Sequence, residues 1–289
     1  MKNKESNFVS LVVYVYNSEK TIKQFLDVID KEFSNYFGKY EIICVNDASI
    51  DDSERNIRMS AENIQAAVSI INMGYHQGLE ASMNAGVDLA IGDFVYEMDS
   101  TVMDYPVGLV KETYKKALEG YDIVTAGPEK NNLVSGFFYR LYNKVTGTQN
   151  KLRTESFRIL SRRAINRIYI LNKTVPYRKA VYANCGLNMY AFSYIPKEKV
   201  KHKQAGKMEI AVTSLVLFSN IAYKVSLSFA MVMAIGTIGA GVYALCNYFG
   251  GRKPVEGWTT TILLLAFGFC AVFVLFAIVI KYLSIILES

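Results

Sequence analysis

Apolar and polar positions along residues 1–208 follow a pattern that predicts buried strands, each followed by an amphipathic helix. Residues 8–16 form a continuous apolar and β-branched run, which is typical of a strand buried on both faces. Residues 19–33 carry apolar side chains at helical spacing, and this pair of elements then repeats. We expect further strands at residues 40–45, 67–71, 93–98 and 122–125, with helices after Asp51, across residues 78–90 and after Pro106. Strands that alternate with helices imply right-handed crossovers, so the predicted fold is α/β with a mostly parallel sheet.

The C-terminal part of the chain has a different pattern. Residues 225–251 and 259–280 contain no Asp, Glu, Lys or Arg. A helix needs roughly 20 apolar residues to cross the hydrocarbon core of a bilayer, so each run is long enough to span it. We therefore expect a globular domain at residues 1–208, an interfacial amphipathic helix at 209–224 and a two-helix transmembrane anchor at 225–289.

The distribution of charge predicts the orientation in the membrane. The 289-residue chain has 32 Lys and Arg against 26 Asp and Glu, a net charge of +6. Six lysines precede the first apolar run, at Lys197, Lys199, Lys201, Lys203, Lys207 and Lys224. The positive-inside rule predicts an integral protein of the cytoplasmic membrane whose large N-terminal domain is cytosolic. The lysine cluster either contacts anionic lipid headgroups or holds a substrate phosphate, and the sequence leaves both interpretations open.

Polar residues follow the carboxyl ends of four predicted strands. Tyr16 and Asn17 follow the first strand, Asp47 the second, Asn72 the third and Asp99 the fourth. Ligands bind outside the carboxyl ends of the strands in an open parallel sheet, so these residues predict a nucleotide site. The alternative is that they only form turns and cap helices. The first strand is not followed by Gly-x-Gly-x-x-Gly, and a Walker loop is missing from the sequence, which disfavours an ordinary dinucleotide or P-loop site.

Several motifs together resemble a known family. They are Val15-Tyr-Asn-Ser-Glu19, Val45-Asn-Asp-Ala-Ser49, Asn72-Met-Gly-Tyr-His-Gln-Gly78, Glu97-Met-Asp-Ser-Thr-Val-Met-Asp-Tyr-Pro106 and Ser156-Phe-Arg-Ile-Leu-Ser-Arg162. In this order they resemble an inverting family 2 glycosyltransferase with the Rossmann-like GT-A fold. With two apolar terminal runs, the chain is similar to the polyprenyl-phosphate glycosyltransferases, which include dolichyl-phosphate mannose synthase.

The resemblance implies the activity and the partners. A sugar would pass from a nucleotide diphosphate to an undecaprenyl- or dolichyl-type polyprenyl phosphate at the cytoplasmic face of the membrane. The implied partners are the nucleotide sugar, the lipid and the membrane, and no nucleic acid. A homo-oligomer is left open.

The resemblance also implies site residues. The nucleotide sugar would contact Tyr16, Asn17, Glu19, Asp47, Asn72, Gly74 and Gly78. The catalytic residues would be Asp99, Ser156 and Arg158, and the lipid phosphate would contact Arg158, Arg162 and Lys203. A divalent cation, Mg²⁺ or Mn²⁺, would be held by Asp99 with Glu97 and Asp104.

The sequence departs from the family pattern at two functional positions. Thr101 stands where the second aspartate of the Asp-x-Asp segment belongs, so we expect weak metal binding that depends mostly on Asp99. Ser156 stands where the family has a base carboxylate, and we expect the neighbouring Glu155 to point away from the site. A lipid phosphate has a second pKa near ~6 and needs little help from a base. The alternative function is a catalytically impaired relative that binds nucleotide or partners in polysaccharide or glycolipid assembly.

Overall fold

A computed structural model describes residues 4–129, 136, 139–140, 143–144, 150–171, 177–196, 221–250 and 257–288. The chain forms two compact units. The larger holds residues 1–143 and 147–205, and the smaller holds residues 144–146 and 206–289. Lys203 and most of the predicted interfacial helix, residues 209–220, lie outside the described residues.

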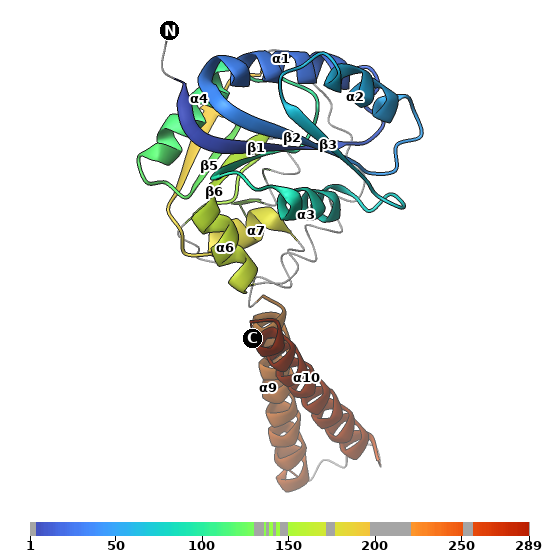
Figure 1. The fold of residues 1–289 in the computed structure, drawn as a ribbon. Helices are drawn as coiled ribbons and strands as arrows, with labels where there is room; N and C mark the ends of the chain where they lie inside the picture. The colour runs from blue at the N-terminus through green and yellow to red at the C-terminus, as the bar shows by residue number, and fades with distance from the viewer. Residues whose placement is uncertain are drawn as a thin grey trace. The chain divides into compact units, whose positions relative to one another are not determined.

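The larger unit alternates strands and helices in its first part, as the sequence predicts (Figure 1). Its elements are β1 (Glu5–Val15), α1 (Ile22–Tyr36), β2 (Phe37–Asn46), α2 (Ser53–Ala61), β3 (Ala67–Asn72), α3 (Leu79–Leu89), β4 (Phe94–Met98), α4 (Gly108–Leu118), β5 (Ile123–Pro128), β6 (Phe157–Ser161), α6 (Arg162–Leu171), α7 (Arg178–Asn184) and β7 (Met189–Tyr194). Helix α1 begins three residues later than predicted, because the backbone N–H groups of Thr21 and Ile22 both turn back to the carbonyl of Ser18.

The strands form one seven-stranded sheet in the order β3-β2-β1-β4-β6-β5-β7. Neighbouring strands are parallel except β6, which runs antiparallel to both β4 and β5. The predicted α/β class with a mostly parallel sheet is therefore confirmed. Strands β6 and β7 were not predicted as strands, and β6 separates β4 from the strand that follows it in the sequence.

Helices cover both faces of the sheet. Figure 1 shows α1, α2 and α4 on one face and α3, α6 and α7 on the other. The apolar side chains of β1, such as Leu11 and Val13, are fully buried in the core that also contains Phe25 of α1. On the other face, a Cβ at Gly86 of α3 would lie 2.3 Å from Val12, so only glycine allows this helix to pack so closely on the sheet.

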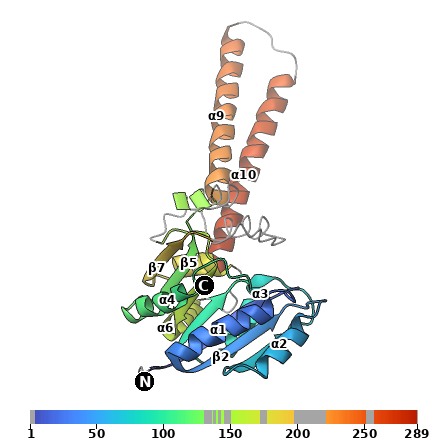
Figure 2. The same cartoon turned by 90° about the horizontal axis from the view of Figure 1, so that it is seen from above.

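The smaller unit contains helices α9 (Ile221–Phe249) and α10 (Trp258–Glu288), which lie side by side in Figure 2. Contacts between Ser226 and Phe273 and between Cys270 and Ala230 show that the two helices are antiparallel. Each contains an 18-residue stretch that is apolar enough to cross a membrane, with mean hydropathy of 1.6 and 2.7. The predicted spans thus correspond to two helices, and the residues from 221 to 224 belong to α9 rather than to a separate element.

Candidate functional site

Asp47, directly after β2, organises the loop before α3. Its carboxylate accepts hydrogen bonds from the backbone N–H groups of Gln77 (2.7 Å) and Gly78 (2.8 Å) and from the Tyr14 hydroxyl (2.8 Å). The Nδ1 atom of His76 lies 2.8 Å from the same carboxylate. Burial, and then the bond to Asp47, raises the pKa of Tyr14 above its usual value. The fully buried Asp47 therefore fixes the residue 76–78 loop, with donors on both of its oxygens.

Asn17 and Glu19 connect the loop after β1 to the loop after β2. The Asn17 side chain accepts a hydrogen bond from the N–H of Ile50 (3.0 Å), and Asn17 itself has a positive φ of 47°, which asparagine tolerates better than most residues. The Glu19 carboxylate accepts a hydrogen bond from the N–H of Asp52 (3.3 Å), and its own N–H donates to Asp51 (3.0 Å). Both predicted nucleotide residues thus hold backbone at the carboxyl end of the sheet.

Aromatic rings are exposed at this end of the sheet. The Tyr16 and His76 rings stack with their centroids 4.1 Å apart, and Tyr16 is 39% exposed. The Asn72 side chain accepts a hydrogen bond from the Asn46 amide (2.9 Å). The carboxyl ends of β1, β2 and β3 therefore bring the predicted residues into one region. His76 is an addition, although the Asn72–Gly78 motif contains it.

The end of β4 carries a buried ionic cluster centred on Arg158. Its guanidinium donates to Glu97 (2.7 Å), to both oxygens of Asp99 (3.1 and 2.8 Å) and to Glu155 (3.0 Å). Glu97 and Arg158 are direct partners in the antiparallel pairing of β4 with β6, which explains why they meet. Arg158 is 1% exposed. All three guanidinium nitrogens thus face carboxylates, and these contacts do not suit the predicted binding of a lipid phosphate.

Helix α7 adds further groups to this cluster. The Tyr182 hydroxyl donates to Glu97 (2.7 Å), and the Arg178 Nε atom lies 3.3 Å from the same carboxylate. The Lys179 ammonium lies 3.7 Å from Asp99. Sequence reasoning missed these three residues, and the basic pair Arg178-Lys179 was the available signal for two of them.

Glu155 and Ser156 point in opposite directions, but the prediction about which of them faces the site was wrong. Glu155 contacts Arg158, whereas the Ser156 hydroxyl lies within hydrogen-bond distance of Tyr194. Tyr194 in turn donates to Asp104 (2.7 Å). The carboxylate beside the Asp99 cluster is therefore that of Glu155, and Ser156 and Asp104 belong to a separate hydrogen-bonded group.

Mutual interactions set the protonation of the cluster. Burial alone would raise the pKa of Asp99, but the charges of Arg158, Lys179 and Arg178 outweigh it and hold that pKa below its usual value. Burial raises the pKa of Glu155 above its usual value, although Arg158 and Lys179 oppose the shift. Asp99 is therefore an anion throughout the neutral range.

The predicted metal ligands do not fit a divalent cation. Both Asp99 oxygens are bound by Arg158, and Glu97 accepts hydrogen bonds from Arg158 and Tyr182. The hydroxyl of Thr101, at the position of the second aspartate, is 2.6 Å from the Thr21 hydroxyl. Within the described part of the chain, no group of three His, Cys, Asp or Glu side chains could hold a metal ion. Guanidinium groups stand where the cation would have to bind.

Arg162 corrects a second prediction. Its guanidinium donates to the backbone oxygens of Gly92 (2.9 Å) and Ala90 (2.8 Å), which precede β4. Asp99 follows β4, so the two residues lie at opposite ends of that strand. Because β6 is antiparallel to β4, the residue after β6 returns to the amino end of β4. Arg162 therefore stabilises the turn between α3 and β4 and does not contact a phosphate beside Asp99.

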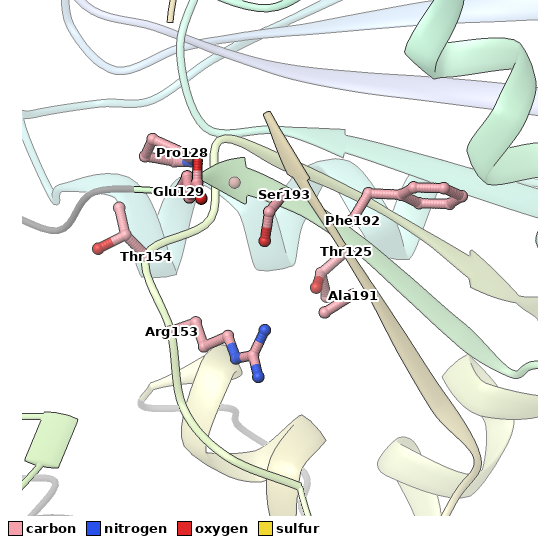
Figure 3. Close-up of a pocket in the computed structure, with 9 residues that line it drawn as sticks. Thr125, Pro128, Glu129, Arg153, Thr154, Ala191, Phe192 and Ser193 are labelled. Carbon is pink, nitrogen blue, oxygen red and sulfur yellow. The ribbon is translucent and has the colours of Figure 1, made fainter. Parts of the chain in front are cut away.

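A pocket of about 220 Å³ opens at the carboxyl ends of β5 and β7 (Figure 3). Figure 3 shows Thr125 and Ser193 on the strands and Arg153 on the segment that precedes β6. Thr125 is the register partner of Arg158, so the pocket and the ionic cluster share a row of the sheet. At the rim, a Cβ on Gly127 would lie 1.9 Å from the Thr154 carbonyl, so the 153–154 segment crosses directly over the strand end.

Known proteins are similar to this chain in sequence and in fold. The family model Glycosyl transferase family 2 matches residues 10–185, which confirms the resemblance seen in the motifs. CsbB of Bacillus subtilis (strain 168) is 29% identical over 69% of this chain, but the match spans only 61% of that protein. The bactoprenol glucosyl transferase of Shigella phage SfV is 24% identical over 90% of this chain and 87% of its own length. The mannosyltransferase PcManGT of Pyrobaculum calidifontis, solved with GDP-Man and Mn²⁺, superposes with a TM-score of 0.52 at 16% identity, over 93% of this chain and 87% of its own.

Proposed function

The chain belongs to glycosyl transferase family 2, and we propose that it transfers a hexosyl group from a nucleoside diphosphate sugar to a polyprenyl phosphate. The observation that carries the proposal is the edge of the sheet, where the loops after β1, β2 and β3 adjoin the ionic cluster after β4. The similarity to the phage bactoprenol glucosyl transferase supports a polyprenyl phosphate as acceptor. Two helices long and apolar enough to cross a membrane support an acceptor that resides in the bilayer.

The proposed donor site uses the two halves of this edge for different parts of the nucleotide sugar. The exposed rings of Tyr16 and His76 offer a face on which a nucleobase can stack. Asp47, Asn17 and Glu19 hold the surrounding loops in place through backbone hydrogen bonds. The diphosphate and the sugar would then lie toward Asp99. Gly78, whose φ is +85°, allows the chain to turn into α3 beside them.

The main requirement of the reaction is that the leaving group be stabilised. An oxygen of the lipid phosphate attacks the anomeric carbon while the bond from that carbon to the β-phosphate oxygen breaks, which inverts the configuration. The electron pair of the broken bond remains on the nucleoside diphosphate, so this group gains negative charge. The lipid phosphate is mostly ionised at pH 7, because its second pKa is about 6. The proposed reaction therefore does not need a base at position 156, where this chain has Ser156, since the nucleophile is already an anion.

The proposed setting is the cytoplasmic face of the cytoplasmic membrane. The lysines between Lys197 and Lys207 precede α9, and positive charge next to a span favours the cytoplasmic side. Anionic headgroups and an anionic lipid phosphate would both be attracted to these side chains. Labelling an introduced cysteine at position 254 from outside intact cells tests this orientation, because the short connection between α9 and α10 should then be extracellular.

A membrane-based transfer assay tests the proposed activity. The full chain, in membranes supplied with undecaprenyl phosphate, is incubated with each of a panel of radiolabelled nucleotide sugars, and the lipid extract is scored for labelled product. Asp99→Asn should abolish the product, whereas the matched variant Asp88→Asn, on the exposed side of α3, should leave it unchanged. Failure to form any lipid-linked product, while nucleoside diphosphates still bind, would favour the catalytically impaired relative instead.

A further inference from the structure

Helix α7 brings two cations to the carboxylates at the end of β4. Arg178 is buried, with its Nη1 atom donating to the backbone oxygen of Glu80 (3.0 Å) and its Nε atom 3.3 Å from Glu97. The Lys179 ammonium lies 3.7 Å from Asp99. The two neighbouring residues thus reach both carboxylates of the motif in which the family resemblance places a metal ion.

One edge of the Arg178 guanidinium makes no hydrogen bond to the described residues, although its Nε atom lies 3.3 Å from Glu97. The Nε and Nη2 hydrogens point to the same side of the group, and this edge is the one that pairs with two oxygens of a carboxylate or phosphate. Both nitrogens are buried, and neither donates a hydrogen bond to any residue that the structure describes. Buried donors are nearly always satisfied in native proteins, so the Nη2 end of this edge indicates a ligand oxygen next to Glu97.

Lys179 is also weakly satisfied by the protein. Its ammonium has three donors, and the hydrogen bond it makes to the carbonyl of Glu155 is long, at 3.4 Å. Its side chain is 13% exposed.

Glu97 and Asp99 are already paired with cations of the protein. Arg158 already pairs with Glu97 and Asp99, so a divalent ion would have to displace a buried guanidinium. We propose that Arg178 and Lys179 bind the diphosphate of the donor and stabilise it as it leaves, in place of a divalent metal ion. This inference rests on the proposed function, because it assigns residues to the leaving group of that reaction. Preorganised cations aimed at developing charge are an effective way to stabilise such a group.

The lipid phosphate of the acceptor presents the same chemistry as the diphosphate. A phosphate from either substrate could pair with the Arg178 edge and the Lys179 ammonium. We assign this site to the donor diphosphate, because Asp99 lies at the same edge of the sheet as the loops of the proposed nucleotide site. Separate binding measurements with each class of phosphate distinguish the two sources.

The test is isothermal titration calorimetry on the full chain in detergent. UDP, GDP, their parent nucleosides and farnesyl phosphate are titrated in EDTA and again in Mn²⁺. We expect a nucleoside diphosphate to bind as tightly in EDTA as in Mn²⁺. Lys179→Met should weaken its binding about 10- to 100-fold, the effect of losing a hydrogen bond to a charged group, and leave the nucleoside unaffected. Lys39→Met, at the exposed start of β2, also removes one positive charge but is distant from Lys179 in the sequence. It should leave diphosphate binding unchanged.

A second variant and a second measurement distinguish a loss of binding from a loss of folding. Arg178→Lys keeps the charge but loses the two-donor edge, so it should also weaken diphosphate binding. Thermal melting of each variant shows whether the fold persists. Binding of the diphosphate only with Mn²⁺ would overturn the inference and leave the proposed function intact. A loss of farnesyl phosphate binding in Lys179→Met, with the diphosphate unchanged, would overturn the assignment to the donor. If no nucleoside diphosphate binds under any condition, the inference and the proposed function both fail.

Discussion

Carboxylates have different roles in the two halves of the sheet edge that is formed by the carboxyl ends of β1 to β4. After β2, Asp47 accepts hydrogen bonds from the backbone of the residue 77–78 segment, and Glu19 does the same for the loop before α2. After β4, Glu97 and Asp99 pair with the side-chain cations Arg158, Arg178 and Lys179.

The difference shows which half can respond to a ligand. A backbone N–H is fixed in place by the chain, so the half beside Asp47 and Glu19 is a preformed set of loops. A lysine or arginine side chain can exchange one anion for another, so the ionic half can accept a phosphate without a large movement of the backbone. The first half is expected to position a ligand and the second to stabilise charge.

Removing Arg158 should have the largest effect on stability. Arg158→Met leaves Glu97, Asp99 and Glu155 without their central partner, and breaking a buried pair in this way costs about 3–5 kcal/mol. Chemical denaturation of the full chain in detergent measures the loss. Arg58→Gln is the matched control, because Arg58 pairs with Glu54 where the two side chains are 64% and 38% exposed, and an exposed pair contributes only about 0–1 kcal/mol. Equal losses in the two variants would contradict a buried ionic cluster.

Asp47→Asn should have the next largest effect. One oxygen becomes an amide NH₂, which cannot accept from Gln77 or Gly78, and an unsatisfied buried donor costs about 1–3 kcal/mol. The same denaturation experiment measures this loss, and proteolysis of the loop before α3 should become faster. Asp88→Asn serves as the exposed control on α3. An unchanged stability for Asp47→Asn would mean that the loop does not depend on this carboxylate.

The pH dependence of stability should separate the two carboxylates beside Arg158. The pKa of Glu155 is raised by burial, so its contribution to stability is present below the unfolded pKa and is lost as the pH rises through the folded pKa. Glu155→Gln mimics the protonated form and should therefore gain stability relative to the native chain as the pH rises from about 4 toward 7, by at most about 1.4 kcal/mol per pH unit.

Asp99 should show the opposite sign. Its pKa is lowered, so its contribution is present above the unfolded pKa and is lost as the pH falls through the folded pKa. Asp99→Asn should thus lose stability relative to the native chain at neutral pH and approach it in acid. Denaturation series at several pH values measure both variants. Parallel pH profiles for Glu155→Gln and Asp99→Asn would contradict the different environments of the two groups.

The smallest effect is expected where the two halves are joined directly. The Thr21 and Thr101 hydroxyls lie 2.6 Å apart, and Thr21→Val removes this hydrogen bond with little change of shape. The expected loss is about 0.5–1.5 kcal/mol. Ser34→Ala, which affects a local bond on the exposed side of α1, is the control. If the double variant Thr21→Val/Thr101→Val costs the sum of two independent losses, the two hydroxyls are not coupled.

Most strands and helices of the larger unit can be predicted from the sequence, together with the polar residues that follow four of the strands. Continuous apolar runs and the 3.6-residue period of helices depend on side chains a few positions apart, so β1 to β5 and α1 to α4 were predictable. Two long uncharged runs predicted α9 and α10 for the same reason. The motif residues Asn17, Glu19 and Asp47 lie in the loops at the carboxyl ends of β1 and β2, as the predicted strands imply, and their contact with a nucleotide stays a prediction.

The assembly of the ionic cluster depends on contacts between segments that are distant in the sequence. Arg158 meets Glu97 because β6 enters the sheet antiparallel beside β4, and the same reversal carries Arg162 to the opposite end of the strand. Arg178 and Lys179 reach Asp99 and Glu97 from a seven-residue helix that lies about 80 residues further along the chain. Such contacts depend on strand register and on the packing of distant segments. No local pattern of apolar and polar residues encodes these, because pairing partners are selected by the burial of whole faces.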